Sequence, residues 1–178
     1  MLTVIKIGGG VGADALRPLC ETVGALAERH ELLVVPGGAG FADAVREADR
    51  RFGLSATAAH RMAILGMEQF GWMLSELIPN AVRCTDLRAV PGRAAVVLPA
   101  GLPLDDLPES WAVTSDSIAA WVARQAGAER LVLVKHPNAA AGVVDEYLPV
   151  LLERARFETR VAGPHQLAEL LDRGPALP

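Results

Sequence analysis

The stretch L-T-V-I-K-I-G-G-G, residues 2–10, decides the fold. A short run of apolar and β-branched residues, Leu2 to Ile7, stops at three successive glycines. Such a run predicts a buried strand that enters a glycine-rich loop. Glycine lets the backbone come close to a ligand, and its N–H groups can then point at phosphate oxygens. Residues 2–10 therefore predict a strand followed by an anion-binding loop.

The rest of the chain repeats this order of strand, loop and helix. Residues 99–110 hold three prolines and predict a loop, and 174–178 predict a loose tail. We expect helices over 13–29, 40–51, 56–77, 115–125 and 164–171, and further strands over 31–35, 94–98, 111–114, 131–134 and 158–162. This alternation is typical of an α/β fold. We therefore expect a three-layer αβα sandwich with a mainly parallel central sheet, in one domain that spans residues 1–178.

Composition narrows the classes of function. The net charge is −4 and no run of like charges stands out, so we expect neither nucleic acid nor a membrane as a partner. No apolar run is long enough to span a bilayer, and the N-terminus lacks the signals of a secreted protein. Cys20 and Cys84 match neither a disulfide framework nor a metal site. These features favour a cytoplasmic protein with reduced thiols.

Two lysines and one aspartate are the candidates for chemistry. Lys6 lies within the first strand, where a central position would demand an anionic partner and an edge position would leave it in solvent. Lys135 follows the strand 131–134, and Asp116 opens the helix 115–125, where Ser115 can also be a plain capping residue. Taken together, they could place two cations around a carboxylate that orients them.

A second glycine loop, P-G-G-A-G at residues 36–40, follows the second strand. Two such loops on neighbouring strands could hold a donor and an acceptor. Arg46 and Arg50 follow four residues apart on one helix face, and His60 comes on the next helix. If that face lines the loop, its guanidinium groups would bind a phosphate or carboxylate. The alternative is that both arginines pair with nearby carboxylates on the surface and that His60 is packed.

Two common nucleotide-binding motifs do not fit. Gly8, Gly10 and Ala13 match the dinucleotide pattern G-x-G-x-x-G/A, which expects an acidic residue at the end of the next strand. That strand ends V-V-P-G without a carboxylate, which argues against a nicotinamide oxidoreductase. The P-loop pattern is absent, which excludes a Walker-type NTPase.

The order of the motifs resembles the amino-acid kinase superfamily, which includes aspartate, acetylglutamate, uridylate and carbamate kinases. The resemblance rests on K-x-G-G-G at 6–10, G-G-x-G at 37–40, S-D-S at 115–117, Lys135, and G-V-V-D at 142–145. Residues 46–66 further resemble the short aspartokinase-related subgroup, which includes a kinase of an aminomethylfuran phosphate in methanofuran synthesis. This chain departs from the family pattern in reading G-G-A in the second loop and in replacing the usual D-G by residues 136–142.

The resemblance implies ATP and Mg²⁺ as cofactors and direct phosphoryl transfer without a covalent enzyme intermediate. It implies catalytic roles for Lys6, Asp116 and Lys135. The residues expected to bind the nucleotide are Gly8, Gly9, Gly10, Ser115 and Lys135. The residues expected to bind the acceptor are Gly37, Gly38, Ala39, Arg46 and His60. No side chains are expected to hold a metal.

The expected function is transfer of the ATP γ-phosphoryl group to a phosphate or carboxylate of a small anionic acceptor. An aminomethylfuran phosphate of methanofuran-type cofactor biosynthesis is one such acceptor. The alternative is a non-catalytic protein on the same fold that binds or stores a nucleotide or oxyanion. Apolar residues in the helix 56–77 could supply both a core stripe and an interface, which predicts a homodimer or higher homo-oligomer: Met62, Leu65, Phe70, Trp72, Met73 and Leu77.

Overall fold

A computed structural model describes residues 1–136 and 144–173. Within these residues one parallel sheet carries six strands in the order β3-β4-β2-β1-β5-β6. The strands are β1 (Leu2–Ile7), β2 (Glu31–Pro36), β3 (Val82–Cys84), β4 (Ala94–Val97), β5 (Arg130–Val134) and β6 (Glu158–Ala162). The α-helices are α1 (Ala13–Ala27), α2 (Ala39–Phe52), α3 (Ala56–Leu77), α4 (Ser115–Gln125), α5 (Leu148–Leu152) and α6 (Leu167–Asp172).

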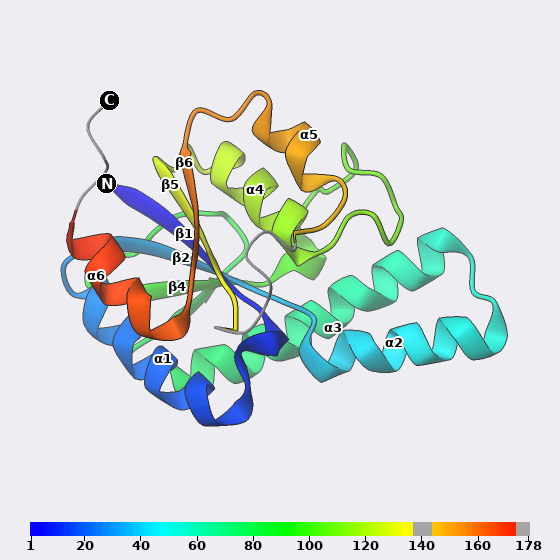
Figure 1. Cartoon of the computed structure of the whole chain (residues 1–178), viewed down its shortest axis with the longest axis horizontal. Coiled ribbons are helices and arrows are strands. Elements are labelled where there is room, and N and C mark those ends of the chain that lie inside the picture. The colour runs from blue at the N-terminus through cyan, green and yellow to red at the C-terminus, as the bar shows by residue number, and fades with distance from the viewer. Residues whose placement is uncertain (137–143, 174–178) are drawn as a thin grey trace.

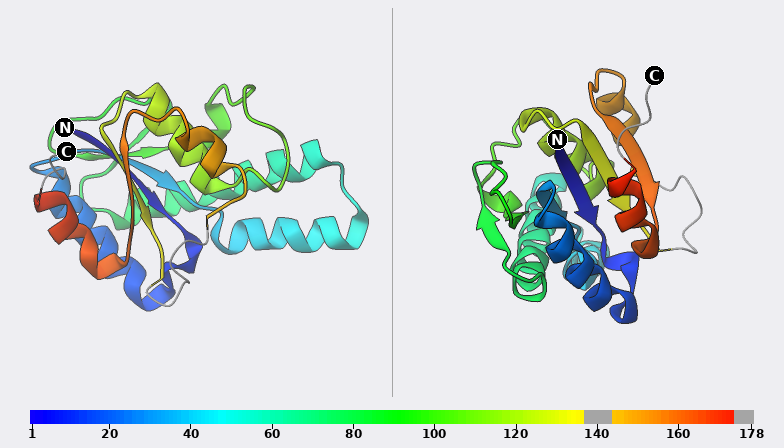
Figure 2. Two further views of the ribbon diagram at one scale, coloured as in Figure 1. Left: turned by 45° about the horizontal axis from the view of Figure 1, so that its top comes forward. Right: turned by 90° about the vertical axis from the view of Figure 1, so that its left-hand side faces the viewer.

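Helices cover both faces of the sheet (Figures 1 and 2). One buried cluster joins the sheet to α1, α6 and the C-terminal half of α3, through residues such as Leu19, Phe70 and Leu167. The other cluster joins the opposite face to α4 and α5, through residues such as Trp121 and Leu148. The predicted three-layer αβα sandwich with a parallel sheet is therefore confirmed.

β1 lies in the interior of the sheet, between β2 and β5. Most of its residues are apolar, as expected of a central parallel strand whose two faces are covered by helices. Lys6 pairs in register with Val35 of β2 and Leu133 of β5, and only 7% of its surface is exposed. This central position settles the question that the sequence left open, because a buried ammonium group requires an anionic partner.

α2 and α3 form a long hairpin that extends beyond the sheet (Figure 1). α2 ends at Gly53, whose φ of 62° lies in the left-handed region that glycine adopts without strain. Ser55 then caps α3 by accepting a hydrogen bond from the Ala58 amide at 3.2 Å. The hairpin places residues of both helices above the carboxyl end of the sheet, where the glycine loops lie.

The prediction for residues 111–114 was wrong, because they form a turn instead of a strand. The Val113 amide donates to the carbonyl oxygen of Ser110 at 3.2 Å, which closes the turn. Val113 is buried through packing and not through pairing in the sheet. The short strand β3 and the short helix α5 were not predicted, since three and five residues carry too little periodicity to be recognised. The predicted tail, 174–178, lies outside the described residues.

Both cysteines are free thiols, as the sequence predicted. Burial raises the pKa of Cys20 and of Cys84 to about 11, so both stay protonated near neutral pH. Among the described residues, no helix combines the length and the apolar character that crossing a membrane requires.

Candidate active site

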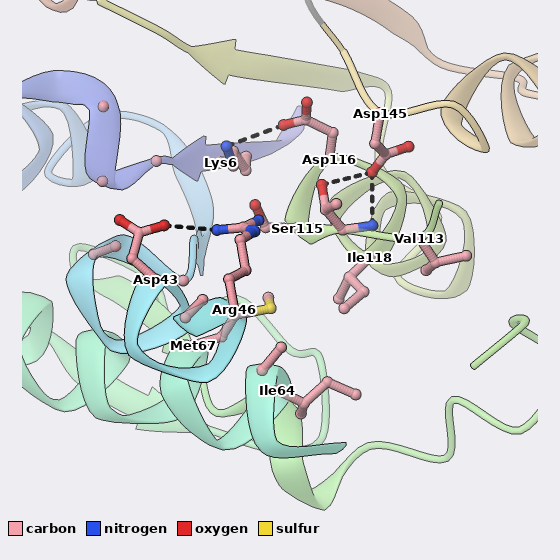
Figure 3. A pocket seen from close by; sticks show the side chains of 18 of the residues that line it. Lys6, Asp43, Arg46, Ile64, Met67, Val113, Ser115, Asp116, Ile118 and Asp145 are labelled. Carbon is pink, nitrogen blue, oxygen red and sulfur yellow. Dashed lines mark hydrogen bonds and ion pairs between the residues drawn. The ribbon is translucent and has the colours of Figure 1, made fainter. Parts of the chain in front are cut away.

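A cavity of about 520 Å³ opens at the carboxyl ends of β1, β2 and β5. This volume is within the range of small-molecule sites. Its walls come from both glycine loops, the α2–α3 hairpin, the N-terminus of α4 and the chain on either side of residues 137–143 (Figure 3). In open parallel sheets, ligands bind at this edge. The cavity is therefore the candidate active site.

The three predicted catalytic residues meet at one wall of this cavity. The Lys6 Nζ lies 3.0 Å from Asp116 Oδ1, and the Lys135 Nζ donates to Asp116 Oδ2 at 2.6 Å. Lys6 and Asp116 are buried and Lys135 is partly buried, with exposed side-chain fractions of 8%, 4% and 18% in that order. Asp116 comes from the first turn of α4, and the lysines come from neighbouring strands. One carboxylate thus holds two ammonium groups at the carboxyl ends of β1 and β5.

Burial and charge act in opposite directions on these groups. Burial lowers the pKa of Lys6, although the nearby Asp116 carboxylate counteracts this effect. Burial alone would raise the pKa of Asp116, but the charges of Lys6 and Lys135 outweigh it and hold that pKa below its ordinary value. Asp116 therefore stays ionised near neutral pH and can orient both lysines.

The glycine loops approach each other closely. A Cβ atom on Gly8 would come within 2.7 Å of the Lys6 Nζ, so Gly8 leaves room for the ammonium group. A Cβ atom on Gly9 would overlap the backbone of Ala39 in the second loop. The Gly37 amide also donates to the carbonyl oxygen of Ile7 at 2.7 Å. The two loops therefore form one continuous floor.

Ala39 occupies the position at which the family pattern has a third glycine. Its φ of 48° lies in the left-handed region, which is unfavourable for alanine by about 1–2 kcal/mol. The departure from the family pattern at this position is therefore accompanied by local backbone strain.

Arg46 lies on the opposite wall, on α2. Its Nη1 donates to Asp43 Oδ1 at 2.7 Å, and its guanidinium lies 5.0 Å from the centre of the Trp111 ring. The Trp111 Nε1 in turn donates to Asp49 Oδ2 at 2.8 Å. Arg46 is half-exposed and lines the cavity, whereas Arg50 pairs with Glu47 at 2.5 Å and is not part of the lining.

The cavity also has an apolar wall. It consists of side chains from α3, α4 and the turn before α4: Ala63, Ile64, Met67, Val113 and Ile118. His60 also lines the cavity; it is buried, and its Nδ1 lies 3.3 Å from the carbonyl oxygen of Ser110. The site therefore combines a charged cluster, an apolar wall and a second cationic group, Arg46 (Figure 3).

The structure brings most of the predicted site residues to this one cavity. Those that line it are Lys6, Gly8, Gly9, Gly10, Gly38, Ala39, Arg46, His60, Ser115, Asp116 and Lys135. Gly37 does not line it, because Gly37 packs against Gly8. Residues 136–142 replace the D-G of the family pattern, and of these seven residues the structure describes only His136.

Sequence reasoning missed Trp111, Asp145 and the apolar wall. Asp145 had a signal, since it ends the G-V-V-D motif, but nothing in the motif showed that its carboxylate enters the site. No sequence signal pointed to Trp111, because the contact of its ring with Arg46 depends on the tertiary structure. The apolar residues looked like ordinary core positions of helices.

Among the described residues, no group of three or more histidine, cysteine, aspartate or glutamate side chains could hold a metal ion. Asp116 is taken up by the two lysines, and the Asp145 oxygens accept hydrogen bonds from backbone and hydroxyl groups.

A parallel αβα fold with two glycine loops and a Lys–Asp–Lys cluster at the carboxyl edge defines a class of phosphate-transferring enzymes. Residues 1–139 match the model of the amino acid kinase family, and the chain belongs to this family. The resemblance seen in the sequence is thereby confirmed. The protein is a kinase of a family that uses ATP.

The chain is similar to other kinases in sequence and in fold. It is 26% identical to the [5-(aminomethyl)furan-3-yl]methyl phosphate kinase of Methanocaldococcus jannaschii, over 95% of this chain and 92% of that protein. The uridylate kinase of Archaeoglobus fulgidus superposes with a TM-score of 0.76 at 18% identity, covering 99% of this chain and 97% of that one. The carbamate kinase of Giardia lamblia bound to AMP-PNP gives a TM-score of 0.64 at 8% identity, covering 97% and 95%. The solved structures support the fold.

Proposed function

We propose that the protein transfers the γ-phosphoryl group of ATP to the phosphate of a small acceptor with an apolar body, such as an aminomethylfuran phosphate. The observation that carries this proposal is the buried cluster of Lys6, Asp116 and Lys135 where the two glycine loops meet. Phosphoryl transfer needs positioning and neutralisation of charge more than covalent chemistry. Two ammonium groups fixed on one carboxylate supply both.

In the proposed reaction an oxygen of the acceptor phosphate attacks the γ-phosphorus atom. The bond between that phosphorus and the β–γ bridging oxygen breaks, and ADP leaves with the bonding electrons. Lys6 stabilises the oxygens of the transferred group, and Lys135 stabilises the nucleotide phosphates. An ionised phosphate is already a nucleophile, so the reaction needs no general base. Bound with ATP, Mg²⁺ would neutralise part of the phosphate charge.

The opposite wall supports an acceptor that is both anionic and apolar. Ile64, Met67 and Ile118 form a surface that suits a small ring. Arg46 can bind an acceptor oxygen if its contact with exposed Asp43 is exchanged for one with the ligand. The similarity to the aminomethylfuran phosphate kinase supports the same acceptor class.

The test is to incubate the purified protein with MgATP and [5-(aminomethyl)furan-3-yl]methyl phosphate, and with UMP or carbamate in parallel. We expect ADP and a diphosphate product, seen by ³¹P NMR, with the furan phosphate and not with the other two acceptors. Turnover of UMP or carbamate, without turnover of the furan phosphate, would contradict the proposed identity of the acceptor. Binding of ATP without ADP formation from any phosphate or carboxylate acceptor would favour the alternative, a non-catalytic binding protein.

We also propose that the chain, as one cytoplasmic domain, assembles into a homodimer or higher homo-oligomer. Large apolar side chains are exposed on α3 and at both ends of α2: Phe41, Phe52, Met62, Leu65, Trp72 and Met73. Other apolar residues of α3, such as Phe70 and Leu74, are already buried in the core. Light scattering should therefore give a multiple of the 18.8 kDa chain mass, and a monomer mass would contradict the proposal.

A further inference from the structure

Asp145 lines the cavity beside the cluster of Lys6, Asp116 and Lys135, but among the described residues it forms no ion pair with Lys6. Instead, its carboxylate binds the N-terminus of α4. Asp145 Oδ2 accepts hydrogen bonds from the Thr114 amide at 2.9 Å, the Thr114 hydroxyl at 2.8 Å and the Ser117 amide at 2.9 Å. Asp145 Oδ1 accepts a hydrogen bond from the Ser117 hydroxyl at 2.5 Å. These contacts join two segments that are far apart in the sequence.

The Asp145 carboxylate caps the N-terminus of α4. The first amides of a helix lack partners within the helix, and the residue at the cap normally supplies an oxygen. Thr114 holds the cap position of α4, but its side chain does not cap the helix. It donates to Asp145, and Asp145 accepts the Ser117 amide in its place. The first turn of α4 is therefore held from outside the helix.

Asp116 lies between Thr114 and Ser117, within the turn that Asp145 holds. Figure 3 shows Asp116 and Asp145 close together at the start of α4. The Asp116 carboxylate must reach Lys6 and Lys135 on two different strands at the same time. A small rotation of this turn would move it from one lysine or from both. Catalytic geometry is sensitive to displacements of about 1 Å.

Asp145 Oδ1 also contacts a third element, helix α5. This oxygen accepts the Leu148 amide at 2.8 Å, at the start of α5. The Asp145 charge further acts to raise the pKa of Lys6, as the least of the influences on that group. Asp145 can therefore influence the active site in three separate ways: it caps α4, it contacts α5, and it carries a negative charge.

We propose that Asp145 is a positioning residue for phosphoryl transfer, which caps α4 from outside and so fixes Asp116 between Lys6 and Lys135. This inference rests on the proposed function. It assigns the effect of Asp145 to the cap on α4, as opposed to its charge or its contact with α5.

Two substitutions separate these effects. Asp145→Ala removes the cap, the tie and the charge, and we expect kcat to fall by about 10²-fold with little change in the KM for ATP. In Asp145→Asn the amide oxygen can take the place of Oδ2 and keep the cap, while the charge is lost and the amino group faces the Leu148 amide. We expect Asp145→Asn to stay within about tenfold of the wild-type kcat.

Asp106→Ala is the matched control. Asp106 binds α4 near its C-terminal end, by accepting from the Trp121 Nε1 at 2.6 Å and from Arg124 Nη2 at 2.9 Å. Its loss should loosen α4 without disturbing the first turn, and kcat should be preserved. A loss of kcat in Asp106→Ala equal to that in Asp145→Ala would overturn the inference, as would equal losses in Asp145→Ala and Asp145→Asn.

A second measurement needs no substrate. In NMR titrations, Asp145→Ala should raise the pKa of the Asp116 carboxyl toward its ordinary value, because the lysines are no longer held beside it. The Ser117 amide should also exchange faster with solvent. Asp106→Ala should change neither. An unchanged Asp116 titration in Asp145→Ala would overturn the inference, and this result stands even if the wild-type protein fails to phosphorylate the proposed acceptor.

Discussion

The cavity has basic and acidic side chains on both sides, and the two sides are built differently. On one side Lys6, Asp116 and Lys135 are buried, with side chains exposed by 18% at most. On the other side, α2 carries the pair Asp43–Arg46, which lines the cavity, and the neighbouring pair Glu47–Arg50, which does not; these side chains are 47–74% exposed. We call these the buried cluster and the surface pairs. The contact distances of the two sets are similar, so distance alone does not tell them apart.

Burial makes the difference. In the low-dielectric interior a charge that loses its partner is strongly unfavourable, whereas water replaces a partner at the surface with little penalty. The buried cluster should therefore be fixed in the absence of ligand. The surface pairs should exchange partners readily, which is what binding and releasing an anionic acceptor requires.

The largest effect should come from removing the carboxylate of the buried cluster. Asp116→Asn removes the carboxylate that Lys6 and Lys135 share and leaves the buried Lys6 without its anion, so the free energy of unfolding should fall by about 3–5 kcal/mol. Urea denaturation measures this change. A loss of less than about 1 kcal/mol, as for a surface pair, would remove the distinction between the two sides.

Lys6→Met tests the chemical role of the buried cluster. The substitution keeps the aliphatic stem and leaves Asp116 paired with Lys135. Because Lys6 acts most strongly on the transition state, kcat should fall by about 10²-fold or more while the protein stays folded. Arg50→Met is the control, since it removes a surface cation, and its kcat should match the wild type. Unchanged turnover in Lys6→Met would place the chemistry elsewhere.

Arg46→Met tests whether a surface pair serves the acceptor. Loss of a charge-assisted hydrogen bond should raise the KM for the acceptor by about tenfold and leave the KM for ATP unchanged. Initial rates at varied acceptor concentration provide the measurement, with Arg50→Met again as the control. If both arginine variants behave alike, the side of the cavity formed by α2 has no role in acceptor binding.

The dependence of stability on pH should reveal the buried cluster as well. The pKa of Asp116 is held below its ordinary value of 3.8, so its contribution is complete above that pH and is lost as pH falls through the lowered value. Below about pH 4, wild-type stability should therefore fall more steeply than that of Asp116→Asn, by up to about 1.4 kcal/mol per pH unit. Parallel curves for the two proteins in urea titrations at pH 2–5 would contradict this.

The smallest effect should come from the matched change on α2. Asp43→Asn removes the carboxylate of an exposed pair, and the free energy of unfolding should change by less than about 1 kcal/mol. It also frees Arg46 from its protein partner, so the KM for the acceptor should stay the same or fall. Destabilisation close to that of Asp116→Asn would show that α2 depends on its surface pairs.

The order of strands and glycine loops was readable from the sequence because it depends on neighbouring residues. The apolar run at Leu2–Ile7 and the glycines after it were sufficient to place β1 and the first loop. The predictions were wrong or missing for short segments for the same reason, since β3 and residues 111–114 offer only a few side chains each. An apolar run such as W-A-V-T can be buried either by pairing in a sheet or by packing in a turn, and only the fold selects between them.

The sequence by itself determined which residues could carry charge into an apolar interior, and it placed Lys6 and Lys135 at strands that precede loops and Asp116 at the start of a helix. Tertiary structure decided that they meet, because β1 lies next to β5 in the sheet and α4 crosses above both. It also decided that Arg46 reaches Trp111 and that Asp145 caps α4. Local propensities act over a few residues, whereas these contacts join segments whose proximity depends on strand order and on the packing of helices against the sheet.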